Sequence, residues 1–237
     1  MLTTAGRVVM ITGANRGIGR AIAERLHQDG YTLSLGARNV DSLAALDTLP
    51  GDEVLRHEFD AHAPDTAARW VAATRERFGR IDAVVNNAGI SLAFDVEAED
   101  ETPLDEMWEV NVKGPLRLVR AAFADLKACG SGRVINIVSL PGKRVKSASI
   151  GGYAMSKHAA AAFNHALRHA GWEHGIRATS VCPGFVATDM TAKVTSVPAS
   201  EMIPPQAVAH LVSSVLVLPN SASISEVPIN CLLEPLY

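Results

Sequence analysis

The sequence predicts an α/β protein built around one doubly wound parallel sheet. Short runs rich in β-branched residues alternate with helix-forming segments along all 237 residues. This alternation is typical of crossover units, in which a helix joins two parallel strands. A glycine-rich turn follows the first predicted strand, where such sheets bind ligands. No repeat, linker or low-complexity tract interrupts the series, so residues 1–237 are expected to form a single domain.

The first crossover begins with a β-branched run, RVVMIT at residues 7–12, which is predicted as a strand. An amphipathic helix is predicted from Ile18 to Gln28, with Ile22 and Leu26 on one face. Further strands are predicted at 31–37, 53–60, 82–87, 133–139 and 177–183. Helices are predicted near 40–47, 64–78, 104–129 and 153–170.

The last third of the chain is less regular. Residues 193–206 (KVTSVPASEMIPPQ) are rich in Ser and Pro, and a helix through Leu218 and a last strand at 225–230 (SEVPIN) are expected to follow. Because this Ser- and Pro-rich stretch comes after the sixth strand, residues 189–206 are a candidate lid over the edge of the sheet.

The composition is that of an ordinary globular protein, with 48% hydrophobic and 20% charged residues. The 22 basic and 25 acidic side chains leave a net charge of -3. This balance lacks the basic excess that nucleic acid or an anionic membrane surface would require, so neither is expected as a partner.

The three cysteines, Cys129, Cys182 and Cys231, are far apart and have no CxxC or Cys/His spacing. Neither a disulfide framework nor a zinc site is therefore expected. The first residues lack the pattern of a signal peptide, and no stretch approaches the roughly 18 apolar residues of a membrane helix. Together these features favour a cytoplasmic protein.

The glycine-rich turn is TGANRGIG at residues 12–19, between the first strand and the first helix. Glycines there let the backbone approach a pyrophosphate, and the helix N-terminus offers unpaired N–H groups. The spacing G-x-x-x-G-x-G moves the middle glycine of the usual dinucleotide fingerprint, and a tight turn without a ligand is the alternative. The expected cofactor contacts in this turn are Gly13, Asn15, Arg16, Gly17, Ile18 and Gly19.

An arginine ends the second predicted strand, in the segment GARN. Arg38 stands where NAD-binding proteins usually place an acid for the ribose hydroxyls. Arg16 lies within reach of the same place, and guanidinium groups bind phosphate through paired hydrogen bonds. The two arginines therefore favour NADP(H) over NAD(H).

A tyrosine and a lysine stand four residues apart in the alanine-rich segment GGYAMSKHAAAAF. On a helix, Tyr153 and Lys157 share one face and one electrostatic environment. The pair can be chance decoration of a solvated helix, or it can be a proton-transfer device. The other motifs decide between these interpretations.

Taken together, the motifs resemble the short-chain dehydrogenases/reductases (SDR) over nearly the whole chain. In chain order they are TGANRGIG (12–19), NNAG (86–89), Asn111 in EVNVKG, Ser139 in RVINIVS, YAMSK (153–157) and CPGFVATDM (182–190). The resemblance implies a Rossmann-type domain with a seven-stranded sheet in the order 3-2-1-4-5-6-7. It also implies a catalytic tetrad at Asn111, Ser139, Tyr153 and Lys157.

The same resemblance implies where a nicotinamide cofactor and a substrate would lie. The adenine is expected near Asp60 and Ala61, ribose and backbone contacts at Asn87, Ala88 and Gly89, and the nicotinamide near Pro183, Val186 and Thr188, with Tyr153 and Lys157 also touching the cofactor. The expected substrate pocket contains Phe94, Leu140, Phe185 and Met190.

Two features depart from the family pattern. The usual glycine-rich close after the last strand is replaced by PINCLLEPLY, which puts the family's common tetrameric contact in doubt. The lid segment is short, which suggests an open pocket. A homo-oligomer, either dimer or tetramer, is still expected.

Hydride transfer between nicotinamide and a carbonyl needs a proton at the substrate oxygen. A free tyrosine has a pKa of about 10, and Lys157 with the positive nicotinamide would lower that of Tyr153 in a desolvated cleft. Ser139 would donate to the substrate oxygen, and Asn111 would anchor a water that links Lys157 to solvent. Taken alone, Ser139 and Asn111 could be a turn former and a locally satisfied helix residue.

Two other groups of side chains carry less weight. The histidines form no metal-like constellation, since His165 and His169 lack a third ligand, so no metal site is expected. The basic cluster GKRVK at 142–146 follows Ser139 and either attracts an anionic substrate or is a solvated loop.

The sequence therefore predicts an NADP(H)-dependent oxidoreductase that interconverts a carbonyl compound and its alcohol, working as a reductase. Its partner would be a small molecule, a ketone or aldehyde or the matching alcohol. Two rival hypotheses use the same fold: a nucleotide-binding sensor without turnover, and an isomerase or dehydratase.

Overall fold

The computed structural model of the chain describes residues 1–46, 49, 52–193 and 195–234. Three predicted segments extend beyond the described residues. These are the helix near 40–47 at its last residue, the lid at position 194, and the domain at 47–48, 50–51, 194 and 235–237.

Seven parallel strands form one sheet in the order β3-β2-β1-β4-β5-β6-β7, which confirms the predicted fold class. The strands are β1 (Val8–Thr12), β2 (Thr32–Ala37), β3 (Val54–Glu58), β4 (Ala83–Asn86), β5 (Arg133–Ile137), β6 (Arg177–Pro183) and β7 (Glu226–Ile229). All seven predicted strands are present. Because the strands are parallel, their carboxyl ends meet at one edge of the sheet.

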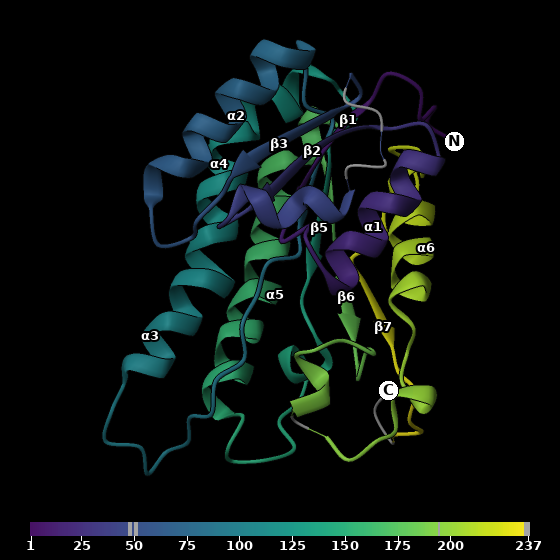
Figure 1. Cartoon of the computed structure of the whole chain (residues 1–237). Coiled ribbons are helices and arrows are strands. Elements are labelled where there is room, and N and C mark those ends of the chain that lie inside the picture. Colours follow the sequence, from purple (N-terminus) through teal and green to yellow (C-terminus); the bar gives the residue numbers. More distant parts are fainter. Residues whose placement is uncertain (47–48, 50–51, 194, 235–237) are drawn as a thin grey trace.

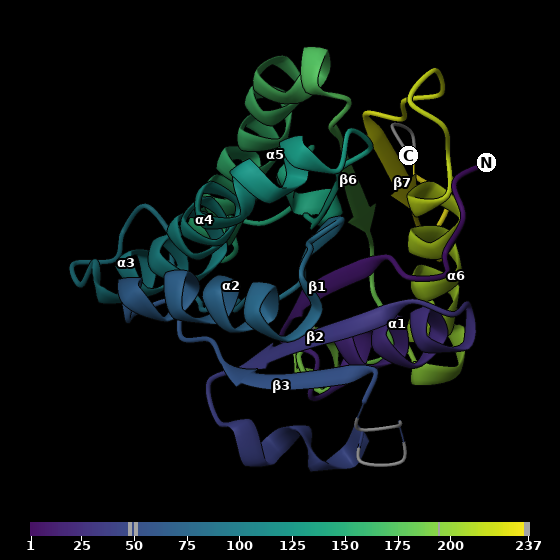
Figure 2. The same cartoon turned by 90° about the horizontal axis from the view of Figure 1, so that it is seen from above.

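Helices cover both faces of the sheet, as Figures 1 and 2 show, with α1 and α6 on one face and α2, α4 and α5 on the other. The α-helices are α1 (Gly17–Gln28), α2 (Pro64–Phe78), α3 (Thr102–Trp108), α4 (Gly114–Ala128), α5 (Gly151–Gly171) and α6 (Pro205–Leu216). Alternate residues of a strand serve the two faces: Val9 and Ile11 of β1 belong to one hydrophobic core, and Met10 belongs to the other.

Two predicted helices differ from the structure. The segment near 40–47 forms a 3₁₀ helix at Val40–Leu46. The segment 104–129 is divided into α3, a π-helical turn at Glu109–Lys113 and α4. Pro115 explains part of this division, because its nitrogen cannot donate to the carbonyl group four residues earlier. Asn111 lies inside the π-helical turn.

Glycine at position 36 lets a large aromatic side chain pack directly on β2. A β-carbon added at Gly36 would lie 2.6 Å from the ring of Trp70 in α2. The Trp70 indole donates a 2.8 Å hydrogen bond to Ser34 Oγ, so its one polar group is satisfied in the core. This contact fixes α2 against the sheet.

A buried chain of amide side chains joins the centre of the sheet to α5. Asn86 Nδ2 of β4 donates to Asn136 Oδ1 of β5 at 2.8 Å, and Asn136 Nδ2 donates to Asn164 Oδ1 of α5 at 2.9 Å. Asn164 Nδ2 then donates to the carbonyl oxygen of Ser225, just before β7, at 3.1 Å. Because an unpaired amide in the core is costly, this chain specifies one position of α5 along the sheet.

Replacing Asn164 by alanine is expected to lower the free energy of unfolding by about 1–3 kcal/mol, because the Asn136 amide would lose its buried acceptor. Urea unfolding followed by circular dichroism measures this loss. His169→Ala, on the exposed side of the same helix, is the control and should change stability by less than about 0.5 kcal/mol. Equal effects of the two substitutions would contradict a specific role for the amide chain.

Candidate functional site

The glycine-rich turn after β1 is held by the segment that follows β4. Thr12 Oγ1 accepts hydrogen bonds from the backbone N–H groups of Asn87 and Ala88, each at 2.9 Å. Asn87 Nδ2 donates to the carbonyl oxygens of Thr12 at 3.0 Å and Gly13 at 3.1 Å. The sequence reasoning did not single out Thr12, although its place at the end of β1 marks it as the residue that joins the two motifs.

Close packing explains the glycines of this turn. Gly13 and Gly17 have φ angles of 63° and 53°, in the left-handed region that glycine tolerates. A β-carbon at Gly19 would collide with the carbonyl oxygen of Gly13, and one at Gly17 would lie 3.2 Å from the Thr188 side chain. Helix α1 begins at Gly17, so its first N–H groups face this turn. The cradle has the shape and the dipole that a pyrophosphate group needs.

The two arginines predicted to hold a phosphate are both solvent-exposed. Arg38 directly follows β2, and no described residue bonds to its side chain. Arg16 precedes α1 and forms a 3.2 Å ion pair with Asp189, in which both side chains are at least 70% exposed. Such an exposed pair contributes little to stability, so Asp189 is a weak competitor for Arg16.

The expected adenine and ribose contacts lie around the ends of β3 and β4. Asp60 accepts a hydrogen bond from the backbone N–H of His62 at 3.0 Å, and the carbonyl oxygen of Ala61 accepts one from Arg117 at 2.6 Å. Gly89 lies close to two members of the predicted tetrad. A β-carbon there would be 3.2 Å from Asn111 Oδ1 and 3.4 Å from Lys157 Nζ.

The predicted tetrad converges at the carboxyl end of β5. Ser139 follows β5, and its hydroxyl donates to the carbonyl oxygen of Pro183, the last residue of β6, at 3.2 Å. Lys157 is buried in α5, where Nζ donates to the carbonyl oxygen of Ile137 at 3.0 Å and lies 5.7 Å from the centre of the Tyr153 ring. The helical spacing thus brings phenol and amine into one environment, as predicted.

The side chain of Asn111 joins a loop to α5. Its Nδ2 donates to the carbonyl oxygen of Ile90 and to Ser156 Oγ, both at 2.9 Å, and its Oδ1 accepts from the N–H of Ile90 at 2.9 Å. Ser156, which the sequence reasoning missed, therefore helps to orient Asn111. Asn111 in the π-helical turn thus lies on the same side of Gly89 as Lys157 of the predicted tetrad.

Burial shifts both ionisable groups of the tetrad toward their neutral forms. It raises the pKa of Tyr153, and a hydrogen bond with Ser139 acts in the opposite direction. It lowers the pKa of Lys157 to about 8. The sequence reasoning expected Lys157, with a bound nicotinamide, to make the phenol more acidic. The polypeptide alone does not, because desolvation outweighs the other influences on both groups.

The four residues expected around the substrate lie at the same edge of the sheet. Leu140 is buried, Phe185 is half-buried and Met190 is exposed. Phe94 pairs with Ile150 in an isolated bridge just before α5.

The predicted lid, residues 189–206, contains two short 3₁₀ helices, Thr191–Lys193 and Ala199–Glu201. Near its end the chain returns to the sheet, where Ile203 forms an isolated bridge with Val186. The lid is thus attached to the segment expected to hold the nicotinamide.

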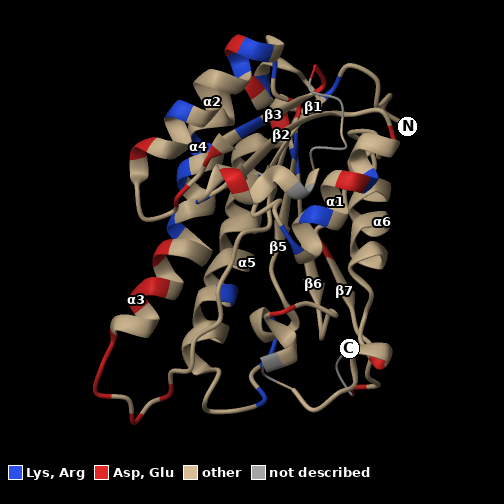
Figure 3. Cartoon of the chain, viewed as in Figure 1, with Lys and Arg blue, Asp and Glu red and all other residues tan. Residues whose placement is uncertain are grey.

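The basic cluster after Ser139 is paired with acids and does not form an open cationic patch. Lys143 pairs with Glu226, and both Arg144 and Lys146 pair with Glu234 at 2.7 Å. Attraction of an anionic substrate by this cluster is therefore not supported. Figure 3 shows charges of both signs distributed over the helices.

The described part of the chain was searched for metal-ligand clusters, paired cysteines and membrane-spanning helices. Within it, no group of three His, Cys, Asp or Glu side chains could hold a metal ion. Cys129, Cys182 and Cys231 are free thiols. None of the helices in the described ranges has both the length and the apolar character needed to cross a membrane.

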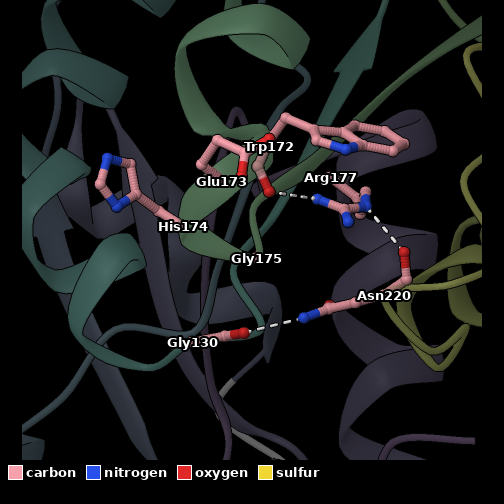
Figure 4. Close-up of a pocket in the computed structure, with 7 residues that line it drawn as sticks. All are labelled: Gly130, Trp172, Glu173, His174, Gly175, Arg177 and Asn220. Carbon is pink, nitrogen blue, oxygen red and sulfur yellow. Dashed lines mark hydrogen bonds between the residues drawn. The ribbon is translucent and has the colours of Figure 1, made fainter.

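A surface cavity of about 490 Å³ lies at the opposite edge of the sheet (Figure 4). Arg177 lies 3.7 Å from the centre of the Trp172 ring, and its guanidinium donates to the carbonyl oxygens of Trp172 and Asn220 at 3.0 and 2.9 Å. Its lining contains no residue of the predicted tetrad or cofactor site. The cavity is therefore separate from the candidate active site.

A family model described as "short chain dehydrogenase" matches residues 7–198. The chain belongs to the short-chain dehydrogenases. The Rossmann-type sheet order expected from the resemblance is present.

Similar proteins and solved structures carry reductase, dehydrogenase or oxidoreductase names. An agropine synthesis reductase of Rhizobium rhizogenes is 40% identical over 97% of this chain, although the chain spans only 54% of that protein. An alcohol dehydrogenase structure from Thermococcus sibiricus, complexed with 5-hydroxy-NADP, has a TM-score of 0.87 and 32% identity over 98% of this chain and 99% of that one. A metagenomic short-chain oxidoreductase in complex with NADP has a TM-score of 0.83 and 28% identity over 98% of this chain and all of that one (100%).

The depressed pKa of Lys157 predicts a pH-dependent stability. The unfolded chain binds more protons than the folded chain between the folded pKa of about 8 and the ordinary value of 10.5, so this residue makes the protein more stable as the pH rises through that window. From about pH 8 to about pH 10, the unfolding free energy of the protein should rise by about 2 kcal/mol relative to Lys157→Met. Urea unfolding of both proteins measures this difference. A constant difference across the window would mean that the amine is not desolvated.

Proposed function

We propose that this short-chain dehydrogenase is an NADP(H)-dependent enzyme that interconverts a ketone or aldehyde and its alcohol, with Tyr153 as general acid and base. The observation that carries the proposal is the buried Lys157 amine, 5.7 Å from the Tyr153 ring and hydrogen-bonded beside the end of β5. Burying an amine costs free energy, so the stability of the fold does not explain why a lysine stands at this position.

The residues of the glycine turn fit a dinucleotide. The close approach of Gly13 and Gly19, together with the free N–H groups of α1, favours a pyrophosphate at the helix N-terminus. When bound, the nicotinamide would give or accept the hydride. Asn87, Ala88 and Gly89 would border the ribose, and Val186 and Thr188 would border the nicotinamide.

Tyr153 would supply the proton in the direction of reduction. Burial keeps its phenol protonated, which is the form that a general acid needs. Ser139 would donate its hydroxyl hydrogen bond to the substrate oxygen in place of the Pro183 carbonyl.

Lys157 would return the proton to the phenol. With a pKa of about 8, this amine can gain or lose a proton near neutral pH. Asn111 would orient the water that connects it to solvent. In the reverse direction, the phenol would accept the proton of the alcohol.

The preference for NADP(H) rests on Arg38 and Arg16. Arg16 lies in the glycine turn and Arg38 directly after β2, and both side chains are exposed where a 2′-phosphate would lie. Arg38 has no carboxylate partner among the described residues. Two guanidinium groups there would bind a phosphate through charge-assisted hydrogen bonds.

The proposal includes a cytoplasmic homo-oligomer, either dimer or tetramer. Leu116 on α4 and Met155 on α5 are 40% and 53% exposed, and a contact between subunits would cover such apolar side chains. Phe94, Leu140, Phe185 and Met190 would form the substrate pocket.

Tyr153→Phe is expected to reduce kcat by at least about 100-fold, because the variant has no phenolic proton to transfer. NADPH affinity should stay within a factor of about two. Consumption of NADPH with a panel of ketones and aldehydes measures turnover, and fluorescence titration measures binding. Tyr31→Phe is the matched control, because the Tyr31 hydroxyl is buried and has no partner among the described residues. Turnover retained by Tyr153→Phe would overturn the mechanism.

Arg38→Asp is expected to weaken NADPH binding about tenfold and to improve NADH binding, since the carboxylate repels a 2′-phosphate and can accept hydrogen bonds from ribose hydroxyls. The dissociation constants of both nucleotides test this. Arg120→Asp, on the exposed side of α4, makes the same change in net charge and should leave both constants unchanged. An unaltered ratio of the two constants in Arg38→Asp would show that the phosphate is bound elsewhere.

A further inference from the structure

Glu234 is an almost buried carboxylate that holds two cations from another segment. Its side chain is 6% exposed, and its oxygens accept hydrogen bonds from Arg144 Nε at 2.8 Å and Nη2 at 2.7 Å, while Lys146 Nζ lies at 2.7 Å. The paired geometry of the Arg144 bonds is the strongest form of such an interaction. Glu234 thus joins the tail after β7 to the loop after Ser139.

The loop that carries these cations is continuous with the candidate active site. The N–H of Gly142 donates to the carbonyl oxygen of Ser139 at 3.0 Å, and the N–H of Arg144 donates to that of Leu140 at 3.1 Å. A β-carbon at Gly142 would lie 2.9 Å from the carbonyl oxygen of Lys157. A displacement of Arg144 would therefore reach the backbone beside three residues of the predicted site.

The tail is attached to the other side of the same site. The N–H of Gly184 donates to the carbonyl oxygen of Ile229 at 2.8 Å, and Cys231 Sγ approaches that of Phe185 at 3.7 Å. A β-carbon at Gly184 would collide with Asn230 Oδ1. The tail thus packs on the segment that carries Phe185, a residue of the expected substrate pocket.

We propose that Glu234 is a positioning residue that sets the charge preference of the substrate site. The inference rests on the proposed function. By binding Arg144 and Lys146, Glu234 keeps both cations engaged with the tail, so that neither is available to a substrate beside the half-buried Phe185. The site then prefers uncharged carbonyl compounds over carboxylated ones. Without this carboxylate, two neighbouring cations repel each other and become available to an anion.

The carboxylate keeps its charge through the range in which the enzyme can be assayed. Its hydrogen bond with Arg144, helped by Lys146 and Asn230, lowers the pKa of Glu234 to about 2. The charge preference should therefore be constant from about pH 5 to about pH 9, apart from the titration of the substrates themselves.

The experiment compares the wild type with Glu234→Gln on pairs of aryl methyl ketones that differ by one para carboxylate. The KM of the variant for the neutral ketone should rise, and the ratio of kcat/KM for the carboxylated over the neutral ketone should increase about tenfold. NADPH affinity should not change. Glu76→Gln, an exposed residue of α2, makes the same change in net charge and should leave the ratio unaltered.

Two further measurements separate charge from folding and from the proposed function. The triple variant Arg144→Gln, Lys146→Gln, Glu234→Gln lacks the cations, so it should lose the gain for carboxylated ketones. Amide hydrogen exchange does not require turnover, and it should be faster at Gly142 and Arg144 in Glu234→Gln than in the wild type.

Each outcome has a definite meaning. An unchanged ratio of kcat/KM, or unchanged exchange in the loop, would overturn the role assigned to Glu234. A wild type that binds NADPH but reduces no carbonyl compound would overturn the proposed function. In that case the exchange measurement still decides whether Glu234 holds the loop after Ser139.

Discussion

The geometry of the active-site edge depends on how α5 is fixed against β5. Three contacts at different heights set this position: the buried hydrogen bond from the Asn136 side chain to that of Asn164, the hydrogen bond from Lys157 to the carbonyl oxygen of Ile137, and the close approach of Gly142 to Lys157. Each lies in the interior, where an unpaired polar group or a gap is costly. The helix therefore carries its tyrosine and lysine to one place beside Ser139.

Desolvation dominates the electrostatics at this edge. The same burial that brings phenol and amine together raises the pKa of the phenol and lowers that of the amine to about 8, so each pKa shifts toward the neutral form of its group. The basic side chains of the loop after Ser139 are paired with acids, Lys143 with Glu226 and both Arg144 and Lys146 with Glu234. The Lys157 amine is still mostly protonated at neutral pH, so this amine and a bound cofactor would set the charge at this edge.

Strand positions were predictable from the sequence because each strand is a short, mostly apolar or β-branched segment that alternates with helix-forming segments, and the resemblance added the order of the strands. The division of the predicted helix at 104–129 could not be predicted from the sequence. The π-helical turn that divides it depends on the packing of Gly114 against Ala61 as well as on Pro115. The pairing of the basic cluster with Glu226 and Glu234 was also missed, because those acids lie about 80 to 90 residues away in the chain. Local patterns carry no information on such contacts.

The π-helical turn at Glu109–Lys113 makes the length of this segment critical. A π-helical turn holds one residue more than an α-helical turn of similar rise, so removing a single residue here would restore a regular helix. Every side chain before the deletion would then rotate by about 100° relative to α4. Asn111 could no longer face both Ile90 and Ser156 while Gly114 kept its contact with Ala61. Insertions and deletions in this family member are thus far less tolerable at this turn than in the exposed loop that precedes α3.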